Sequence, residues 1–174
     1  MLGHRIRRDF LRFAILWALL LGRAMGQESP GTAAPEATQT PSLDYKNQSA
    51  QEITQLFLKG FERWNARDLD GYMEMFWKSP DVMDAIDNEV VWGWAALRAE
   101  LMRGYPDRSA MGTVNSERLE IRILTTDLAT AVNKWSVQFA KAKVLGTSVL
   151  MLRKFSEGWR IISAHTSSSE IPTN

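Results

Sequence analysis

The stretch LMLRKFSEGWRIISAHTS, residues 150–167, has the pattern of two strands joined by a tight turn. Apolar and polar residues alternate on both sides of the turn, which is typical of strands with one buried face. Gly158 adopts the positive φ of short hairpin loops more easily than other residues do. The stretch therefore predicts a β-hairpin whose second strand begins at Trp159.

Two segments before this hairpin, residues 116–124 and 128–140, alternate with the same period of two. A turn residue separates each strand from the next, with Asp127 between these two and Gly146 before the hairpin. The second half of the chain is therefore expected to form an antiparallel meander of four strands.

The first half shows helical spacing instead. Ser49 and Glu52 fit a capping box, and the apolar stripe that follows runs through Trp64. A second, short helix is expected from Asp68, with apolar residues as far as Phe76 on one side. A short hairpin over residues 81–92 and a third helix over residues 94–105 complete the pattern. Helices followed by antiparallel strands indicate an α+β fold.

The chain of 174 residues is expected to hold one domain, residues 49–174, behind a leader and a linker. Residues 1–26 combine a basic start, a short apolar run and small residues before Gln27, and predict a signal peptide. Within them, RRDFLR at residues 7–12 resembles a twin-arginine signal, although a general secretory signal is the alternative. Residues 27–48, rich in Pro, Thr and Gln, predict a flexible linker. We therefore expect a periplasmic or secreted protein that is routed by the twin-arginine pathway.

Composition excludes several functions. The leader holds five arginines and one aspartate, which give it a net charge of +4. The whole chain has a net charge of +1, so the residues after the leader carry −3. This argues against nucleic-acid binding, which needs a basic face. The chain has no cysteine, and His165 is its one histidine outside the leader. We therefore expect no metal site, no cofactor and no disulfide, and no permanent membrane span.

Four segments carry a family resemblance: FERWNARDLDGYMEMF (residues 61–76), GWAALRAEL (93–101), LATAVNKWSVQ (128–138) and the terminal hairpin. In this order they resemble the nuclear transport factor 2-like superfamily, and most closely its SnoaL-like and ketosteroid-isomerase-like bacterial members. The resemblance covers residues 49–169. It implies a cone-shaped, strongly curved antiparallel sheet wrapped around three N-terminal helices, with a pocket at the open end.

The resemblance also implies a homodimer formed through the outer face of the sheet. Alternation places three apolar side chains on that face, at Val132, Leu150 and Ile162, where a monomer would leave them in contact with water. The superfamily includes both enzymes and binding domains, so the fold does not settle the function.

His165 is the first candidate for chemistry. Strict alternation from Trp159 would place Ile161, Ser163 and His165 on one face, and the apolar start of the strand indicates that this face is inward. The resemblance also implies a histidine of this motif at the pocket. Imidazole titrates near neutral pH, so it can exchange a proton or hold a ligand carboxylate. The alternative is a partly buried histidine bonded to a neighbouring hydroxyl.

Asp84 is the second candidate. Counted back from Gly93, it falls near the position where, by resemblance, ketosteroid isomerases carry their catalytic aspartate. Such an enzyme uses a carboxylate in an apolar pocket to move a proton between carbon atoms. Asp84 shares parity with Val82 and Ile86, which would let it face inward. The favoured alternative is an aspartate on an edge strand, in solvent.

Other candidates would line a pocket. Aromatic side chains at these spacings are mostly core, but pockets for apolar ligands are lined by the same types. Arg153 would pair with an anionic ligand if it faced inward, and is otherwise an exposed strand residue. The aromatic candidates are Trp64, Tyr72, Phe76, Trp94 and Trp135.

Two hypotheses for the function follow. The first is an exported domain that binds a small apolar or amphipathic molecule without chemistry of its own. The second is a cofactor-independent lyase or isomerase in which Asp84 and His165 act as acid and base. An oligomeric assembly domain is a third, weaker possibility.

Overall fold

The computed structural model describes residues 40–108 and 111–172, which fall within one compact unit spanning residues 38–174. The expected signal peptide, and the expected linker as far as residue 39, lie outside the described residues. Among the described helices, none is both long and apolar enough to cross a membrane.

The first helix, α1 (Leu43–Asn65), begins seven residues earlier than the capping box predicts. Its N-cap is Ser42, whose side chain accepts a hydrogen bond from the Tyr45 amide at 3.2 Å. Asp44 adds a negative charge in the first turn, where the helix dipole favours it. Ser49 is therefore buried inside the helix, and the predicted capping box was wrong. A tertiary contact explains the extension, because the Tyr45 hydroxyl donates to the Thr126 carbonyl.

Two more helices flank a short hairpin. The helix α2 (Leu69–Met73) has the expected N-cap, Asp68, whose carboxylate accepts from the Gly71 amide at 2.8 Å. It ends before Phe76 and is shorter than predicted. The hairpin consists of β1 (Met83–Ile86) and β2 (Glu89–Trp92), and it precedes α3 (Trp94–Gly104). The three helices are therefore not consecutive.

Four long strands complete one six-stranded sheet, in the order β2-β1-β6-β5-β4-β3. Their antiparallel pairing confirms the predicted meander, and Gly158 has the expected positive φ of 107°. However, β1 pairs with β6 in parallel, so the sheet is mixed and not antiparallel throughout. The long crossover between these two strands, which contains α3 and four strands, makes a parallel pair possible. The long strands are β3 (Thr113–Ile123), β4 (Leu128–Gln138), β5 (Ala142–Phe155) and β6 (Gly158–Pro172).

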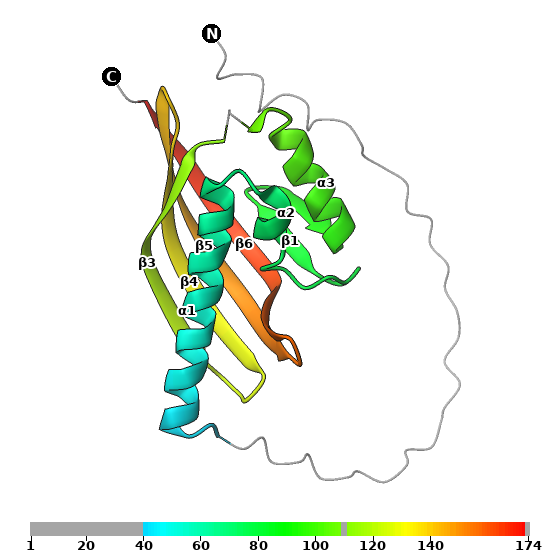
Figure 1. Cartoon of the computed structure of the whole chain (residues 1–174), viewed down its shortest axis with the longest axis vertical. Helices are drawn as coiled ribbons and strands as arrows, with labels where there is room; N and C mark the ends of the chain where they lie inside the picture. The colour runs from blue at the N-terminus through cyan, green and yellow to red at the C-terminus, as the bar shows by residue number, and fades with distance from the viewer. Residues whose placement is uncertain (1–39, 109–110, 173–174) are drawn as a thin grey trace, which may run out of the picture. The chain divides into compact units, whose positions relative to one another are not determined.

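Helix α1 lies along one face of this curved sheet, with α2 and α3 beside its C-terminal half (Figure 1). The side chains between the helices and the sheet form two apolar clusters. The first joins Ile53 and Phe57 of α1 to Leu152 and Ile161 of the sheet. The second joins Trp64 at the end of α1 to Val137 and other residues nearby. We name the face that α1 covers the inner face, and the opposite one the outer face.

A β-bulge changes which side chains of β6 face inward. Leu152 pairs with Ile161 and Met151 with Ser163, so Ile162 is an extra residue between them. Before the bulge Trp159 and Ile161 face inward, and after it Ala164 does. Leu150 pairs with Ala164 and is buried on the inner face, so its predicted place on the outer face was wrong.

Candidate functional site

Asp84 lies on the inner face, not in solvent. In the sheet it pairs with Val91 of β2 and with Ala164 of β6, and Ala164 is buried in the first apolar cluster. Its Oδ1 atom is buried and has no hydrogen-bond partner among the described residues. Burial raises the pKa of Asp84 to about 6, although the nearby charge of His165 acts in the opposite direction. The structure therefore places a carboxyl group with an unmet hydrogen bond inside the domain.

His165 lies on the other face. It follows Ala164 directly and pairs with Ala85, so its side chain points outward and is exposed. The bulge at Ile162 is the physical reason, because it reverses the alternation on which the inward prediction depended. Asp84 and His165 therefore lie on opposite faces of the sheet, and the predicted acid–base pair is not formed inside the domain.

The charge of Asp84 acts on Tyr72, and a second tyrosine, Tyr105, acts on Tyr72 as well. Burial raises the pKa of Tyr72, and the charges of Asp84 and Tyr105 raise it further. Burial also raises the pKa of Tyr105. Tyr72 was predicted from the sequence, but Tyr105 was not. The signal was present, because Leu97, Leu101 and Tyr105 follow one another at a helical spacing of four.

The predicted aromatic candidates divide into two groups. Trp64, Tyr72 and Phe76 do converge inside the domain. The Trp64 ring meets Tyr72 and Tyr105 edge to face, with centroids 5.2 and 5.1 Å away, and Tyr72 meets Phe76 at 6.1 Å. Trp94 instead donates to the Met73 carbonyl at 3.1 Å and so ties α3 to α2.

Trp135 and Arg153 have other surroundings. Trp135 lies on the inner face, where its ring covers Gly146 and its Nε1 donates to the Ser148 hydroxyl at 2.9 Å. Arg153 lies on the outer face with an exposed side chain, 3.5 Å from the Asp127 carboxylate. It therefore does not face a ligand inside the domain, and the pocket-facing alternative was wrong.

The two apolar clusters meet at one place, which we name the junction. On the helical side it consists of Phe61, Tyr72 and Leu101, the half-buried residues that pack against both clusters. On the sheet side, Asn133 lies on β4 between Ala131 of the first cluster and Val137 of the second. Asp84 belongs to the junction because its charge acts on Tyr72.

A row of polar side chains on neighbouring strands runs across the sheet and includes Asn133. The register aligns Asn133 with Ser148 and Ser148 with Thr166 across three strands. The hydroxyls of Ser148 and Thr166 are 2.8 Å apart, and Ser116 donates to the Asn133 Oδ1 at 2.7 Å. Asn133 is 2% exposed. Asn133 was not predicted, because a single asparagine within an alternating strand carries no signal of its own.

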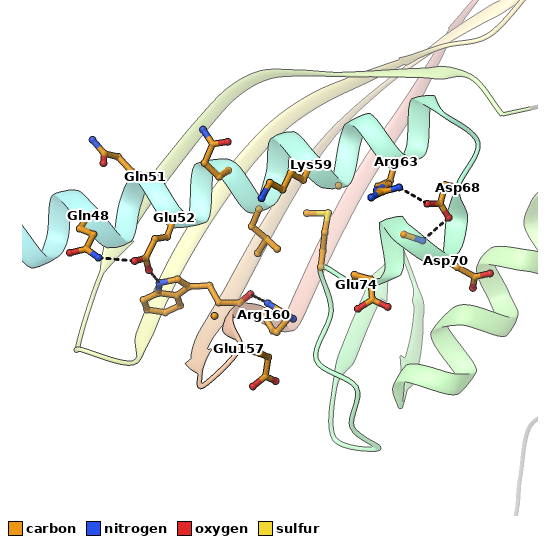
Figure 2. Close-up of a pocket in the computed structure, with 17 residues that line it drawn as sticks. Gln48, Gln51, Glu52, Lys59, Arg63, Asp68, Asp70, Glu74, Glu157 and Arg160 are labelled. Atoms are coloured by element: carbon orange, nitrogen blue, oxygen red, sulfur yellow. Dashed lines mark hydrogen bonds and ion pairs between the residues drawn. The ribbon is translucent and has the colours of Figure 1, made fainter.

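The structure has a hollow with a volume of about 1000 Å³, and it lies outside the junction. It is an open groove between the exposed side of α1, α2 and the β5–β6 turn (Figure 2). Where a carboxyl pKa is shifted here, at Glu52, Asp70 and Glu157, it is shifted downward. The causes are hydrogen bonds from Lys154, Arg98 and the backbone amide of Glu157, respectively. These acids are satisfied and charged, unlike Asp84, so we place the candidate site at the junction.

Within residues 40–108 and 111–172, no group of three or more potential ligands could hold a metal ion. The junction offers one carboxylate, one phenol and one amide. Such a set suits hydrogen bonding to an organic molecule, or the exchange of a proton with it.

Comparison with known proteins gives a likeness of structure but not of sequence. No protein-family model matches the chain, and no curated protein matches its sequence. A nuclear transport factor 2-like protein of unknown function from Shewanella oneidensis is 28% identical, with a TM-score of 0.66 over 68% of this chain and 98% of that one.

Two further solved structures have lower identity. A candidate scytalone dehydratase from Novosphingobium aromaticivorans is 10% identical, with a TM-score of 0.63 over 76% of this chain and 93% of that one. A nuclear transport factor 2-like protein of unknown function from Pseudomonas putida is 20% identical, with a TM-score of 0.58 over 70% and 87%. At these identities the likeness concerns the fold alone. The domain therefore has the nuclear transport factor 2-like, cystatin-like fold that the sequence resemblance implied.

Proposed function

We propose that the domain binds a small, largely apolar or amphipathic molecule at the junction, with Asp84 as its polar contact. The observation that carries this proposal is the buried Oδ1 of Asp84, which has no partner among the described residues. An unsatisfied buried polar atom costs about 1–3 kcal/mol. A ligand that donates a hydrogen bond to Asp84 offsets that cost only when it is bound.

The surroundings of Asp84 fit such a ligand. Aromatic and aliphatic side chains form most of the junction, and ligand sites are commonly apolar with a few placed polar groups. Tyr72 and Leu101 keep some accessible surface although both pack against the two clusters. We infer that a ligand contacts this remaining surface.

Titration of tryptophan fluorescence with naphthol, an apolar molecule with one hydroxyl, tests the proposal. A carboxylate accepts a hydrogen bond better than a neutral acid does, so binding should tighten as the pH rises from 5 through 6 to 8. Asp84→Leu should weaken binding about tenfold at pH 8 and remove this pH dependence. As a control, Asp70→Leu changes an exposed aspartate outside the junction. Equal binding by wild type and Asp84→Leu at every pH would refute the proposal.

Proton transfer is the second candidate function. The observation that favours it is the pKa of about 6 at Asp84, because a general base works best when its pKa is near the operating pH. Tyr72, whose raised pKa keeps its hydroxyl protonated, would then donate to a substrate oxygen. This version replaces His165 with Tyr72 as the partner of Asp84. The solved structure named as a candidate scytalone dehydratase shows that an enzyme assignment has been made for this fold.

An NMR experiment separates this candidate from simple binding. Wild-type protein should exchange the hydrogen atoms next to the carbonyl of tetralone, a bicyclic ketone, for solvent deuterium. Asp84→Asn should abolish the exchange, because an amide cannot act as a base. If the wild-type rate equals the rate without protein, the binding function remains and catalysis is excluded for this type of ketone.

We also propose that the chain forms a homodimer through the outer face. Four of the exposed large apolar side chains of the chain lie on the outer face. The register of the strands brings these four side chains together in two neighbouring rows across the sheet. Exposed apolar surface of this kind marks an interaction site. The four are Val90, Trp92, Val149 and Met151.

Light scattering of the full chain at micromolar concentration tests the dimer. Wild type should have the mass of two chains, and Val149→Lys should have the mass of one. Leu58→Lys is the matched control, because Leu58 is also exposed but lies on α1. A wild-type monomer would exclude this interface.

Export by the twin-arginine route remains our proposal for the leader. Its motive is the sequence RRDFLR before an apolar run. Changing both Arg7 and Arg8 to lysine should retain the chain in the cytoplasm, and cell fractionation would detect this. Wild-type protein found in the cytoplasm at full length would contradict the proposal.

A further inference from the structure

The open groove beside α1 contains two cations that lack a carboxylate partner. Lys59 of α1 and Arg160 of β6 both line the groove, and Figure 2 shows Arg160 across the groove from the helix that carries Lys59. Lys59 is exposed and makes neither a hydrogen bond nor an ion pair with any residue of 40–108 and 111–172. Arg160 donates one N–H to the Trp159 carbonyl at 2.8 Å, and no carboxylate of the same residues lies within ion-pair distance of it.

The five carboxylates that line the groove already have partners. Four of them form ion pairs at 2.7–3.3 Å, and the fifth, Glu157, accepts from the Ser156 hydroxyl at 2.9 Å. The pKa of Glu157 is lowered chiefly by its own backbone amide, and the charge of Arg160 is the smallest of the causes. These acids therefore leave the positive charges of Lys59 and Arg160 available to a ligand. The four ion pairs are Glu52–Lys154, Asp68–Arg63, Asp70–Arg98 and Glu74–Lys78.

Met75 keeps the two cations in the same part of the groove. Its carbonyl accepts from the amide of Ile161, the residue after Arg160, at 2.9 Å. Its sulfur occupies the space that a side chain at Gly60, the residue after Lys59, would take. One methionine therefore spans the distance between the two backbones. Lysine and arginine have long side chains, so both reach a single anionic group that lies over Met75.

The floor of the groove beside these cations is apolar. Met75 and Trp159 are buried residues that line it, and the half-buried Leu56 lies next to them in the lining. The carbon stems of the lysine and the arginine add to this surface. An inorganic anion would gain nothing from such a floor, whereas an organic anion would remove it from water.

We infer that the groove is a second ligand site, for a small carboxylic acid with an apolar body. The carboxylate pairs with Lys59 and Arg160, and the apolar body lies on Leu56 and Met75. The guanidinium of Arg160 keeps four N–H groups and bonds a carboxylate at two points, whereas Lys59 acts as a point charge. The site shares no residue with the junction, so it goes beyond the proposed function and does not rest on it.

Octanoate, octanol and octylamine test the inference, because they share one chain and differ in charge. Two-dimensional NMR of the backbone amides of the full chain, at pH 7 and low salt, is the readout. Octanoate should shift the amide signals of Gly60 and Gly158, which line the groove. It should bind about fivefold more tightly than octanol, because only the carboxylate pairs with the cations. Octylamine should bind least, and added salt should weaken only the binding of octanoate.

Substitutions at the two cations identify the residues that read the charge. Lys59→Gln and Arg160→Gln should each weaken octanoate binding about three- to fivefold and leave octanol binding unchanged. Lys59→Arg and Arg160→Lys keep the charge and should retain most of the affinity, which separates the loss of charge from a loss of folding. Lys134→Gln is the matched control, because Lys134 is an exposed lysine that does not line the groove. It should bind octanoate as wild type does.

The possible results separate this site from the junction. An absence of shifts with octanoate, or equal affinities for octanoate and octanol, would refute the inference. Shifts at Tyr72 and Leu101 with none at Gly60 and Gly158 would place the ligand at the junction, in support of the proposed function and against a site in the groove. If octanoate shifts the groove signals while naphthol binds nowhere, the inference stands and the proposed function fails.

Discussion

Glu52 and Asp84 are two carboxylic acids of this domain with opposite surroundings. Glu52 accepts hydrogen bonds from Lys154 at 2.8 Å, Gln48 at 3.0 Å and Trp159 at 3.1 Å, and its pKa is lowered chiefly by the bond from Lys154. Asp84 has a buried oxygen without a partner among the residues that the structure describes, and its pKa is raised to about 6 by burial. The first acid ties α1 to the β5–β6 hairpin. The second acid, Asp84, lowers the stability of the fold, and we propose that its function is to bind a ligand.

The largest expected effect is a gain of stability in Asp84→Asn. A pKa raised from the usual range near 4 to about 6 means that ionisation of Asp84 opposes folding, increasingly so as the pH rises through this window. The neutral amide avoids that cost, so the variant should be more stable by about 1–2 kcal/mol at pH 8. The difference should disappear below pH 4, where both states are protonated. Urea unfolding at several pH values measures it.

The same substitution at Asp70 provides the control. Asp70 is exposed and bonded to Arg98 at 2.7 Å, which lowers its pKa, so Asp70→Asn should not stabilise the fold. A loss of stability in Asp84→Asn at pH 8 would mean that the Asp84 carboxylate, like that of Glu52, has a stabilising partner in the folded protein.

The next effect concerns the hairpin that positions the partners of Glu52. Gly158 has a φ of 107° and separates Lys154 from Trp159. A β-branched residue is strained at such a φ, so Gly158→Val should cost about 1–2 kcal/mol in thermal unfolding. Gly104→Val is the control, because Gly104 has open space around it and no positive φ. Equal melting temperatures for Gly158→Val and wild type would show that the turn tolerates a side chain.

A smaller loss is expected in Glu52→Gln. Because the pKa of Glu52 is lowered, its carboxylate stabilises the fold at pH values above the usual pKa range of a glutamate. This stabilisation is lost as the pH falls through that range and below. The side chain is 36% exposed, and solvent screens the pair with Lys154. The expected cost is therefore about 0.5–1 kcal/mol at pH 7. Urea unfolding at pH 7 and at pH 3 should show it only at the higher pH, and a loss at both would indicate packing instead of charge.

The sequence predicted the meander and the third helix because long periodic segments dominate their own local structure. It did not predict the parallel pairing of β1 with β6, since nothing in either strand encodes a neighbour so distant in the chain. The start of α1 was missed because the Tyr45–Thr126 contact lies outside any local pattern.

The residues of the candidate site also fall into those that the sequence predicts and those that it does not. Tyr72 and Trp64 follow from helical spacing, whereas His165 was misplaced because one bulge reverses every later side chain of the strand. Asn133 and the inward position of Asp84 depend on pairing across strands, which only the folded sheet reveals.

The smallest expected effect belongs to His165→Ala, and it tests how far the outer face influences Asp84. His165 is exposed, so the substitution should change stability by less than about 0.5 kcal/mol at pH 8. Its positive charge lowers the pKa of Asp84, and its removal should therefore raise that pKa further. Carbon NMR of the Asp84 carboxyl across pH 4–8 measures the change. A lower pKa of Asp84 in the variant, or a large loss of stability, would mean that His165 supports the interior of the domain directly. The contrast between an exposed residue of the outer face and a buried residue of the inner face would then no longer hold.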